Sequence, residues 1–428
     1  MTSYLLERAW VGGEVRTDVL VEVLDGRFVL VEPERPGAAA TRVPGLTLPG
    51  LANGHSHAFH RALRGRTQRG RGTFWTWREQ MYDLAGRLDP DSYFLLGRAA
   101  YREMVAAGYT TVGEFHYLHH QPGGRSYEDP NAMGHALVAA AREAGTRLVL
   151  LDTCYLAGGF GEPLSEAQLR FGDGDAEGWA KRVADIEHDH VGAAVHSVRA
   201  VPRYQLPVVV AAAQGRPLHV HVSEQVAEND GCEAAYGLTP TTLLGEAGAL
   251  GPLTTAVHAT HLTDGDVGLL AGSGTSVCLC PTTERDLGDG IGPARRLADA
   301  GVRLGIGSDS HAVVDAFEEL RALELDERLA SQSRGCFSAS DLLATGTLHA
   351  SLGIADAGAI EVGRRADLVT IDTATARTAG TGADEHTAVF AATSADVTRV
   401  VVDGRVVFAG EHADVGAELD QVIRELWP

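Results

Sequence analysis

The chain has 428 residues, 44% of them hydrophobic, which is enough for a large buried core. Its formal net charge is -21 and its pI is about 5.2, so we expect neither nucleic acids nor anionic membranes as partners. We expect no signal peptide and no spanning helix, because no apolar run reaches the roughly 18 residues that a bilayer requires. The five cysteines are scattered and lack CxxC spacing, which predicts reduced thiols and a cytoplasmic location.

Both ends of the chain show the pattern of β-hairpins. Apolar runs at 20–24 and 27–31 flank Asp25-Gly26, and the runs at 397–402 and 405–408 flank Asp403-Gly404. Asp-Gly readily adopts the positive φ angles of a tight hairpin turn. Because each end is small for an independent core, we expect residues 1–48 and 366–428 to form one small β-sandwich together, followed by a C-terminal helix.

The middle of the chain, residues 49–365, alternates short apolar runs with Ala-rich amphipathic segments such as 93–107 and 131–144. Alternating strands and helices predict a parallel sheet, and eight runs favour a closed (β/α)₈ TIM-type barrel. Catalytic groups of such barrels gather at the C-terminal ends of the strands. The eight runs lie at about 46–53, 110–115, 147–152, 192–198, 217–222, 254–258, 275–280 and 303–308.

Polar side chains follow five of these runs. His55 and His57 end the first run, and their i, i+2 spacing places both imidazoles on one side of a strand. Taken singly, such residues can be buried core histidines, helix caps or carboxylates at helix N-termini. Together, at one mouth of a barrel, they predict a metal site. The later runs end in or near His196 and Arg199, His221 and Glu224, His258, and Asp309.

Three imidazoles and one carboxylate, from His55, His57, His221 and Asp309, suit a divalent ion. Zn²⁺ matches these ligands best, and Fe²⁺ and Mn²⁺ remain alternatives. An ion of this kind activates a water molecule near neutral pH. Glu224 follows the ligand His221 by three residues, so we expect it to carry protons, with His258 and Asp309 as further catalytic groups.

The order and spacing of these residues resemble the amidohydrolase superfamily, as does the segment 358–369 near the predicted return to the terminal β structure. Two-metal members of that superfamily use a carboxylated lysine from the fourth strand. Here the fourth run ends in His196, and the single lysine, Lys181, lies in a predicted helix. The resemblance therefore implies a single ion.

A closer resemblance is to the formimidoylglutamate deiminase family. It rests on His55-Ser56-His57-Ala58-Phe59, Phe74-Trp75-Thr76-Trp77-Arg78-Glu79, Glu114-Phe115-His116-Tyr117 and His196-Ser197-Val198-Arg199. It implies hydrolysis of N-formimidoyl-L-glutamate to N-formyl-L-glutamate and ammonia, a reaction of histidine degradation. It also implies that Arg78, Tyr117, His196 and Arg199 bind this small acidic substrate. His60 departs from the pattern, because the family is expected to have glutamine there.

Arginine suits such a substrate, because its guanidinium presents a fork of donors to a carboxylate and glutamate carries two. Two other functions stay open: deamination of a nucleobase, nucleoside or other amidine, and a non-catalytic barrel that serves binding or assembly. Family analogy also implies a homodimer. The remaining histidines near the strand ends are interpreted as supporting or structural, namely His116, His119, His120, His261 and His311.

Overall fold

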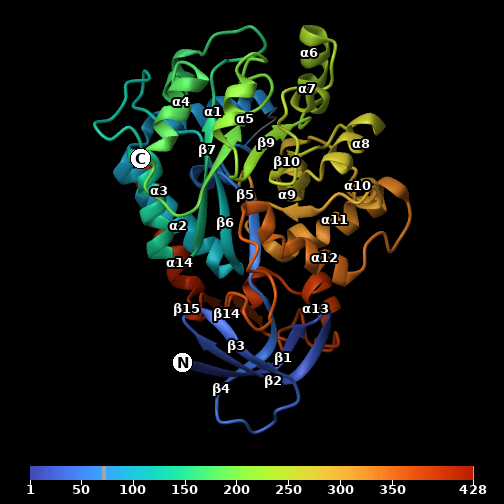
Figure 1. Cartoon of the computed structure of the whole chain (residues 1–428). Helices are drawn as coiled ribbons and strands as arrows, with labels where there is room; N and C mark the ends of the chain where they lie inside the picture. Colours follow the sequence, from blue (N-terminus) through green and yellow to red (C-terminus); the bar gives the residue numbers. More distant parts are fainter. Residues whose placement is uncertain (70–73, 428) are drawn as a thin grey trace.

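The computed structural model describes residues 1–69 and 74–427. In these residues eight parallel strands form a nearly closed barrel with helices around it, and a seven-stranded mixed sheet lies at one end (Figure 1). The mixed sheet combines strands from both chain ends. The predicted TIM-type barrel and the β structure shared by the two termini are therefore confirmed.

Each barrel strand matches one of the predicted apolar runs. Their residues are almost entirely buried, as expected for parallel strands that are covered on both faces. The eight strands pair in chain order. They are β5 (Leu51–Ser56), β6 (Tyr109–His116), β7 (Arg147–Cys154), β8 (Val191–Val195), β9 (Leu218–Val222), β10 (Thr254–His258), β11 (Ser276–Leu279) and β12 (Leu304–Ile306).

Helices connect the barrel strands and cover the outside of the barrel (Figure 1). The predicted segments 93–107 and 131–144 correspond to α2 and α3. The helices are α1 (Phe74–Arg87), α2 (Pro90–Ala106), α3 (Ala132–Ala144), α4 (Ala176–Ala184), α5 (Leu206–Ala212), α6 (Val226–Tyr236), α7 (Pro240–Glu246), α8 (Asp264–Ser273), α9 (Pro281–Leu287), α10 (Ala294–Asp299), α11 (Ala316–Ser331), α12 (Ala339–Gly346), α13 (Glu385–Phe390) and α14 (His412–Leu426). Short 3₁₀ segments are η1 (Ala58–Leu63), η2 (Glu166–Phe171), η3 (His349–Leu352) and η4 (Ser394–Asp396).

The barrel closes between its first and last strands. The Asn53 amide donates to Ser308 Oγ at 2.7 Å, and Ser308 N–H donates to Asn53 Oδ1 at 3.0 Å. Asp309 N–H also donates to the His55 carbonyl at 3.0 Å. Gly307 permits this approach, since a Cβ at that position would lie 2.8 Å from the Cβ of His55. The closing contacts thus run directly into the residues of the predicted metal site.

The terminal sheet has the strand order β15-β14-β13-β4-β1-β2-β3. Both predicted hairpins are present, and Asp25, Gly26, Asp403 and Gly404 all have the positive φ angles that such turns require. The sheet consists of β1 (Thr2–Val11), β2 (Glu14–Leu24), β3 (Arg27–Glu32), β4 (Thr41–Pro49), β13 (Leu368–Ile371), β14 (Val397–Val402) and β15 (Arg405–Phe408).

The apolar run at 46–53, predicted as one strand, is divided between the two sheets. Its first part belongs to β4 and its second part begins β5. Gly50 lies at the junction, where a Cβ would come within 2.3 Å of Thr110 Oγ1. The sequence pattern did not reveal this division because both halves are equally apolar and buried.

Buried ion pairs join the barrel to the terminal sheet. Arg147, at the start of β7, donates to Asp367 at 2.7 Å and to Asp403 at 2.7 Å. Arg147 and Asp367 are buried, so each charge depends on the other for compensation.

Among the described residues, no helix is both long and apolar enough to span a bilayer.

Candidate active site

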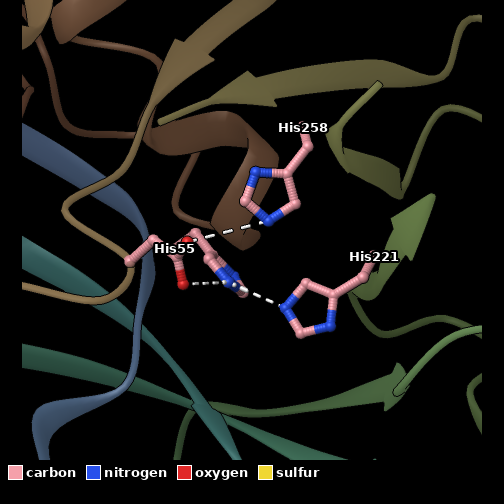
Figure 2. A group of neighbouring side chains, drawn as sticks. His55, His221 and His258 are labelled. Carbon is pink, nitrogen blue, oxygen red and sulfur yellow. Dashed lines mark hydrogen bonds and ion pairs between the residues drawn. The ribbon is translucent and has the colours of Figure 1, made fainter. Parts of the chain in front are cut away.

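The predicted metal ligands come together at the C-terminal ends of the barrel strands. His55 and His57 lie at and just beyond the end of β5, His221 lies on β9, and Asp309 follows β12. The Nε2 atoms of His55 and His57 lie 3.3 Å and 3.4 Å from the same atom, Asp309 Oδ1. His221 Nε2 lies 3.0 Å from His55 Nε2. Figure 2 shows the rings of His55, His221 and His258 directed towards one another.

The other ring nitrogens fix the orientation of two of these imidazoles. His57 Nδ1 donates to the Phe115 carbonyl at 2.9 Å, and His221 Nδ1 donates to the His196 carbonyl at 2.8 Å. Burial lowers the pKa of His57 and of His221 and lowers the pKa of His55 to about 3, so these rings are neutral at neutral pH. A neutral ring that donates through Nδ1 has a lone pair on Nε2. The Nε2 lone pairs of His57 and His221 therefore point towards a carboxylate and another imidazole.

This donor set fits a divalent cation. Ligand bonds of about 2.0–2.1 Å in tetrahedral geometry place neighbouring ligand atoms roughly 3.3–3.4 Å apart, close to the separations above. Buried lone pairs that face a carboxylate are unfavourable unless a positive charge lies between them. His258, His55, His221 and Asp309 also lie within 4.8 Å of one another through their ligand atoms. His258, however, approaches the other carboxylate oxygen, Oδ2, at 3.7 Å.

Glu224 and His258 lie together beside this cluster. His258 Nε2 is 3.9 Å from Glu224 Oε1, and its Nδ1 is 3.4 Å from Oε1 of Glu284 on α9. Burial lowers the pKa of His258, but the carboxylates of Glu224, Glu284 and Asp309 outweigh it and raise that pKa well above its usual value. Burial raises the pKa of Glu224, which suits a group that must both accept and release a proton.

Glu284 was not predicted from the sequence. It is buried, and the Cys280 N–H donates to its Oε1 at 2.9 Å. The signal that could have identified it is a lone carboxylate in the first turn of the helix that follows the seventh apolar run.

One pocket contains all four predicted substrate-binding residues, Arg78, Tyr117, His196 and Arg199. His57, His221, Glu224, His258 and Asp309 line the same pocket. The residues predicted as substrate contacts therefore lie in one pocket with part of the predicted metal site. Seven further lining residues were not predicted as substrate contacts: His60, Trp77, Met81, Tyr82, Tyr155, Leu287 and Ser310.

Some of these residues hold the predicted side chains in place. The hydroxyl of Tyr117 lies 2.9 Å from His60 Nε2, and the ring of Tyr155 packs on His196 at 4.2 Å between centroids. In the sequence, His60 marks only a departure from the family pattern. Trp77 belongs to the aromatic segment that carried the family resemblance, whereas the side chains of Phe74 and Trp75 lie outside the described residues.

The histidines interpreted as structural include a second buried group. His116 and His119 lie near Asp152, but both Asp152 oxygens accept hydrogen bonds from Arg182 at 2.8–2.9 Å. Trp179 donates to the same carboxylate at 3.0 Å. A guanidinium that already compensates this carboxylate opposes a further cation. Lys181 is exposed on α4, as its predicted helical position implied.

Comparison with known proteins identifies the family of the chain. The amidohydrolase family model matches residues 46–407. Formimidoylglutamate deiminase of Pseudomonas aeruginosa is 38% identical over 436 residues, which cover 96% of each chain. 5'-deoxyadenosine deaminase of Methanothermobacter thermautotrophicus is 29% identical and covers 94% of this chain and 92% of its own. The crystal structure of an amidohydrolase from Brucella melitensis superposes with a TM-score of 0.91 at 31% identity, over 100% of both chains. The chain belongs to the amidohydrolase family, as a hydrolase that acts on carbon–nitrogen bonds.

Proposed function

We propose that this enzyme hydrolyses N-formimidoyl-L-glutamate to N-formyl-L-glutamate and ammonia, as a step of histidine degradation. The observation that carries the proposal is the position of Arg78 and Arg199 in one pocket with Glu224 and the histidine–aspartate cluster. The 38% identity to a formimidoylglutamate deiminase along almost the whole chain supports the same substrate.

The pocket suits a substrate with a cationic amidine at one end and two carboxylates at the other. Arg78 and Arg199 would each receive a carboxylate through a charge-assisted hydrogen bond. Tyr117 and His196, whose rings contact those of His57 and His221, would hydrogen-bond the substrate and set its depth. A pocket for a nucleobase would not require two guanidinium groups in a protein of net charge -21.

We assign His55, His57, His221 and Asp309 as ligands of one divalent ion, with Zn²⁺ the best match to three imidazoles and one carboxylate. The assignment favours His57 over His258 because His55 and His57 approach the same oxygen of Asp309. When bound, such an ion supplies Lewis acidity and lowers the pKa of water towards neutrality.

The proposed chemistry then depends on Glu224. It accepts a proton from water while the water oxygen forms a bond with the formimidoyl carbon. It returns this proton to the terminal nitrogen. It then accepts the second water proton from the new hydroxyl group as the carbonyl forms and the carbon–nitrogen bond breaks, and it passes that proton to the departing ammonia, which leaves a cationic amidine substrate as ammonium. His258, placed between Glu224 and Asp309, orients the water by hydrogen bonding. Glu284 keeps the His258 ring turned towards that position.

The direct test is an ammonia-release assay on metal-analysed enzyme, with N-formimidoyl-L-glutamate compared against 5'-deoxyadenosine, adenosine, guanine and cytosine. The proposal expects kcat/KM to be highest for the formimidoyl substrate. A preference for a nucleoside, which the relatedness to 5'-deoxyadenosine deaminase makes the second candidate, would replace it. Inertness towards the whole panel together with a specific protein ligand would instead indicate a non-catalytic barrel.

A further inference from the structure

Three loops beside the proposed active site are tied together in a closed ring of hydrogen bonds. His261, after β10, donates its backbone N–H to the Ser223 carbonyl at 3.0 Å. The His261 ring donates through Nε2 to the carbonyl of Asp289 at 2.8 Å. The Gln225 side-chain amide donates to Asp289 Oδ1, which closes the ring. Because Ser223 and Gln225 flank Glu224 in the chain, the ring encloses the segment that carries Glu224.

The loop after α9 packs against the His261 ring. Gly288 and Gly290 have φ angles of +74° and +121°, and a Cβ on Gly290 would lie 3.5 Å from His261 Cε1. Asn229, on α6, donates to the His261 carbonyl at 2.7 Å. The Asp289 N–H donates to the carbonyl of Glu284, the residue whose side chain contacts His258. The ring is therefore linked to His258, through Glu284, as well as to Glu224.

The backbone requires outside support on both sides of the hydrogen bond between His261 and Ser223. Ser223 has a φ angle of +53°, and His258 and Ala259 have φ angles of +67° and +51°. Non-glycine residues adopt this left-handed region at an energetic cost and persist there only when their surroundings fix them. Glu224 and Asp289 are also buried, so few solvent contacts could replace the ring.

We propose that Gln225, His261 and Asp289, here called the Glu224 clamp, are positioning residues that fix the Glu224 carboxylate at the distance needed for proton transfer. The inference rests on the proposed role of Glu224. His261 and Asp289 do not line the pocket that contains the predicted substrate contacts, whereas Gln225 lines an adjoining pocket with Arg78 and Arg199. Loss of the His261 side chain should therefore affect turnover rather than substrate binding.

The test compares variants that break the clamp with variants that keep its hydrogen bonds. His261→Leu and Gln225→Leu each remove one donor, whereas His261→Gln retains a donor near the Nε2 position. Asp289→Asn retains the Oδ1 acceptor, and it changes little charge because burial and Glu224 raise the pKa of Asp289 to about 8. A misplacement of about 1 Å at a reacting group can cost roughly 100-fold in rate. We expect both leucine variants to lose kcat by about this factor, with metal content close to wild type. In His261→Leu the KM should also stay close to wild type, and both conservative variants should retain most turnover.

Backbone hydrogen exchange gives a readout that does not depend on the substrate. In metal-loaded protein, amides of residues 223–230 should exchange faster in His261→Leu and Gln225→Leu than in wild type, and at the wild-type rate in His261→Gln. Unchanged exchange together with unchanged kcat would overturn the clamp, as would a rise in KM alone. If wild type releases no ammonia from N-formimidoyl-L-glutamate, the proposed function fails, while the exchange comparison still decides whether the ring holds this segment. Two separate leucine variants keep the test decisive if one of them does not fold.

Discussion

His55 and Asp309 are joined through both backbone and side chain. The Asp309 N–H donates to the His55 carbonyl at 3.0 Å, and His55 Nε2 lies 3.3 Å from Asp309 Oδ1. The contact that closes the barrel between β5 and β12 is therefore also part of the proposed metal site. The closure of the barrel and the proposed chemistry therefore involve the same pair of residues.

Replacing Asp309 should remove the metal. Asp309→Ala deletes the only carboxylate among the four proposed ligands, so metal affinity should fall by more than the roughly 10- to 100-fold that supporting partners contribute. Elemental analysis after dialysis measures this loss. The melting temperature should then stop responding to added Zn²⁺, because an ion stabilises the fold only in proportion to its binding. Asp420→Asn, an exposed carboxylate on α14, is the matched control. A variant that keeps a full complement of metal would contradict the ligand assignment.

Removing the proton carrier should separate metal binding from turnover. Glu224→Gln keeps the size of the side chain but cannot accept a proton, so kcat should fall by about 100- to 10,000-fold. Metal content should remain at the wild-type level. Glu233→Gln changes an exposed carboxylate on α6, the helix that follows Glu224 in the chain, and should leave both quantities unchanged. Near-normal ammonia release by the Glu224 variant would exclude it as the proton carrier.

The proposed binding of the substrate carboxylates by Arg78 and Arg199 should be visible in KM. Hydrogen bonds to charged groups contribute about 1.5–3 kcal/mol, so Arg199→Ala should raise KM for N-formimidoyl-L-glutamate by roughly 10- to 100-fold. Steady-state kinetics on metal-loaded enzyme measures it. Arg203→Ala serves as the control, because Arg203 is about half exposed and pairs with Glu246 at 2.7 Å. If both variants bind the substrate like wild type, the acidic end of the substrate lies elsewhere.

The junction between barrel and terminal sheet should be sensitive to Arg147. Arg147→Met leaves Asp367 buried without its partner, and breaking a buried pair in this way costs about 3–5 kcal/mol of unfolding free energy. Urea denaturation of the metal-loaded enzyme measures the change. Arg405→Met alters an exposed arginine on β15 and should have little effect. Equal unfolding free energies for the two variants would show that the ion pairs do not couple barrel and sheet.

Periodicity and spacing predicted most of the architecture because barrel strands are continuous apolar runs and their catalytic residues follow at the ends. The Asp-Gly turns identified both hairpins for the same local reason. The division of the run at 46–53 was not predictable, since it depends on the contact of Gly50 with Thr110, which lies far away in the chain. Local pattern does not encode such a contact.

The sequence predicted those residues of the candidate site that lie at the ends of barrel strands, such as His55, His221 and Asp309. It missed residues that act through a tertiary contact. Glu284 and Asp289 lie on and after α9, and only the tertiary structure shows that they contact His258 and Gln225. Tyr155 is likewise placed by tertiary contacts, because its ring packs on His196 and its hydroxyl accepts a hydrogen bond from the Gln168 amide.

The closure of the barrel at the metal cluster has a consequence for synthesis of the chain. Asn53 and Ser308, whose side chains make the closing contact, are 255 residues apart. Contacts of such long range form late in folding, because the entropy of closing the intervening chain must be overcome first. A ribosome-bound chain that ends before β12 carries three of the four proposed ligands but lacks the carboxylate. Metal uptake can then be complete only after the barrel has been fully translated and closed.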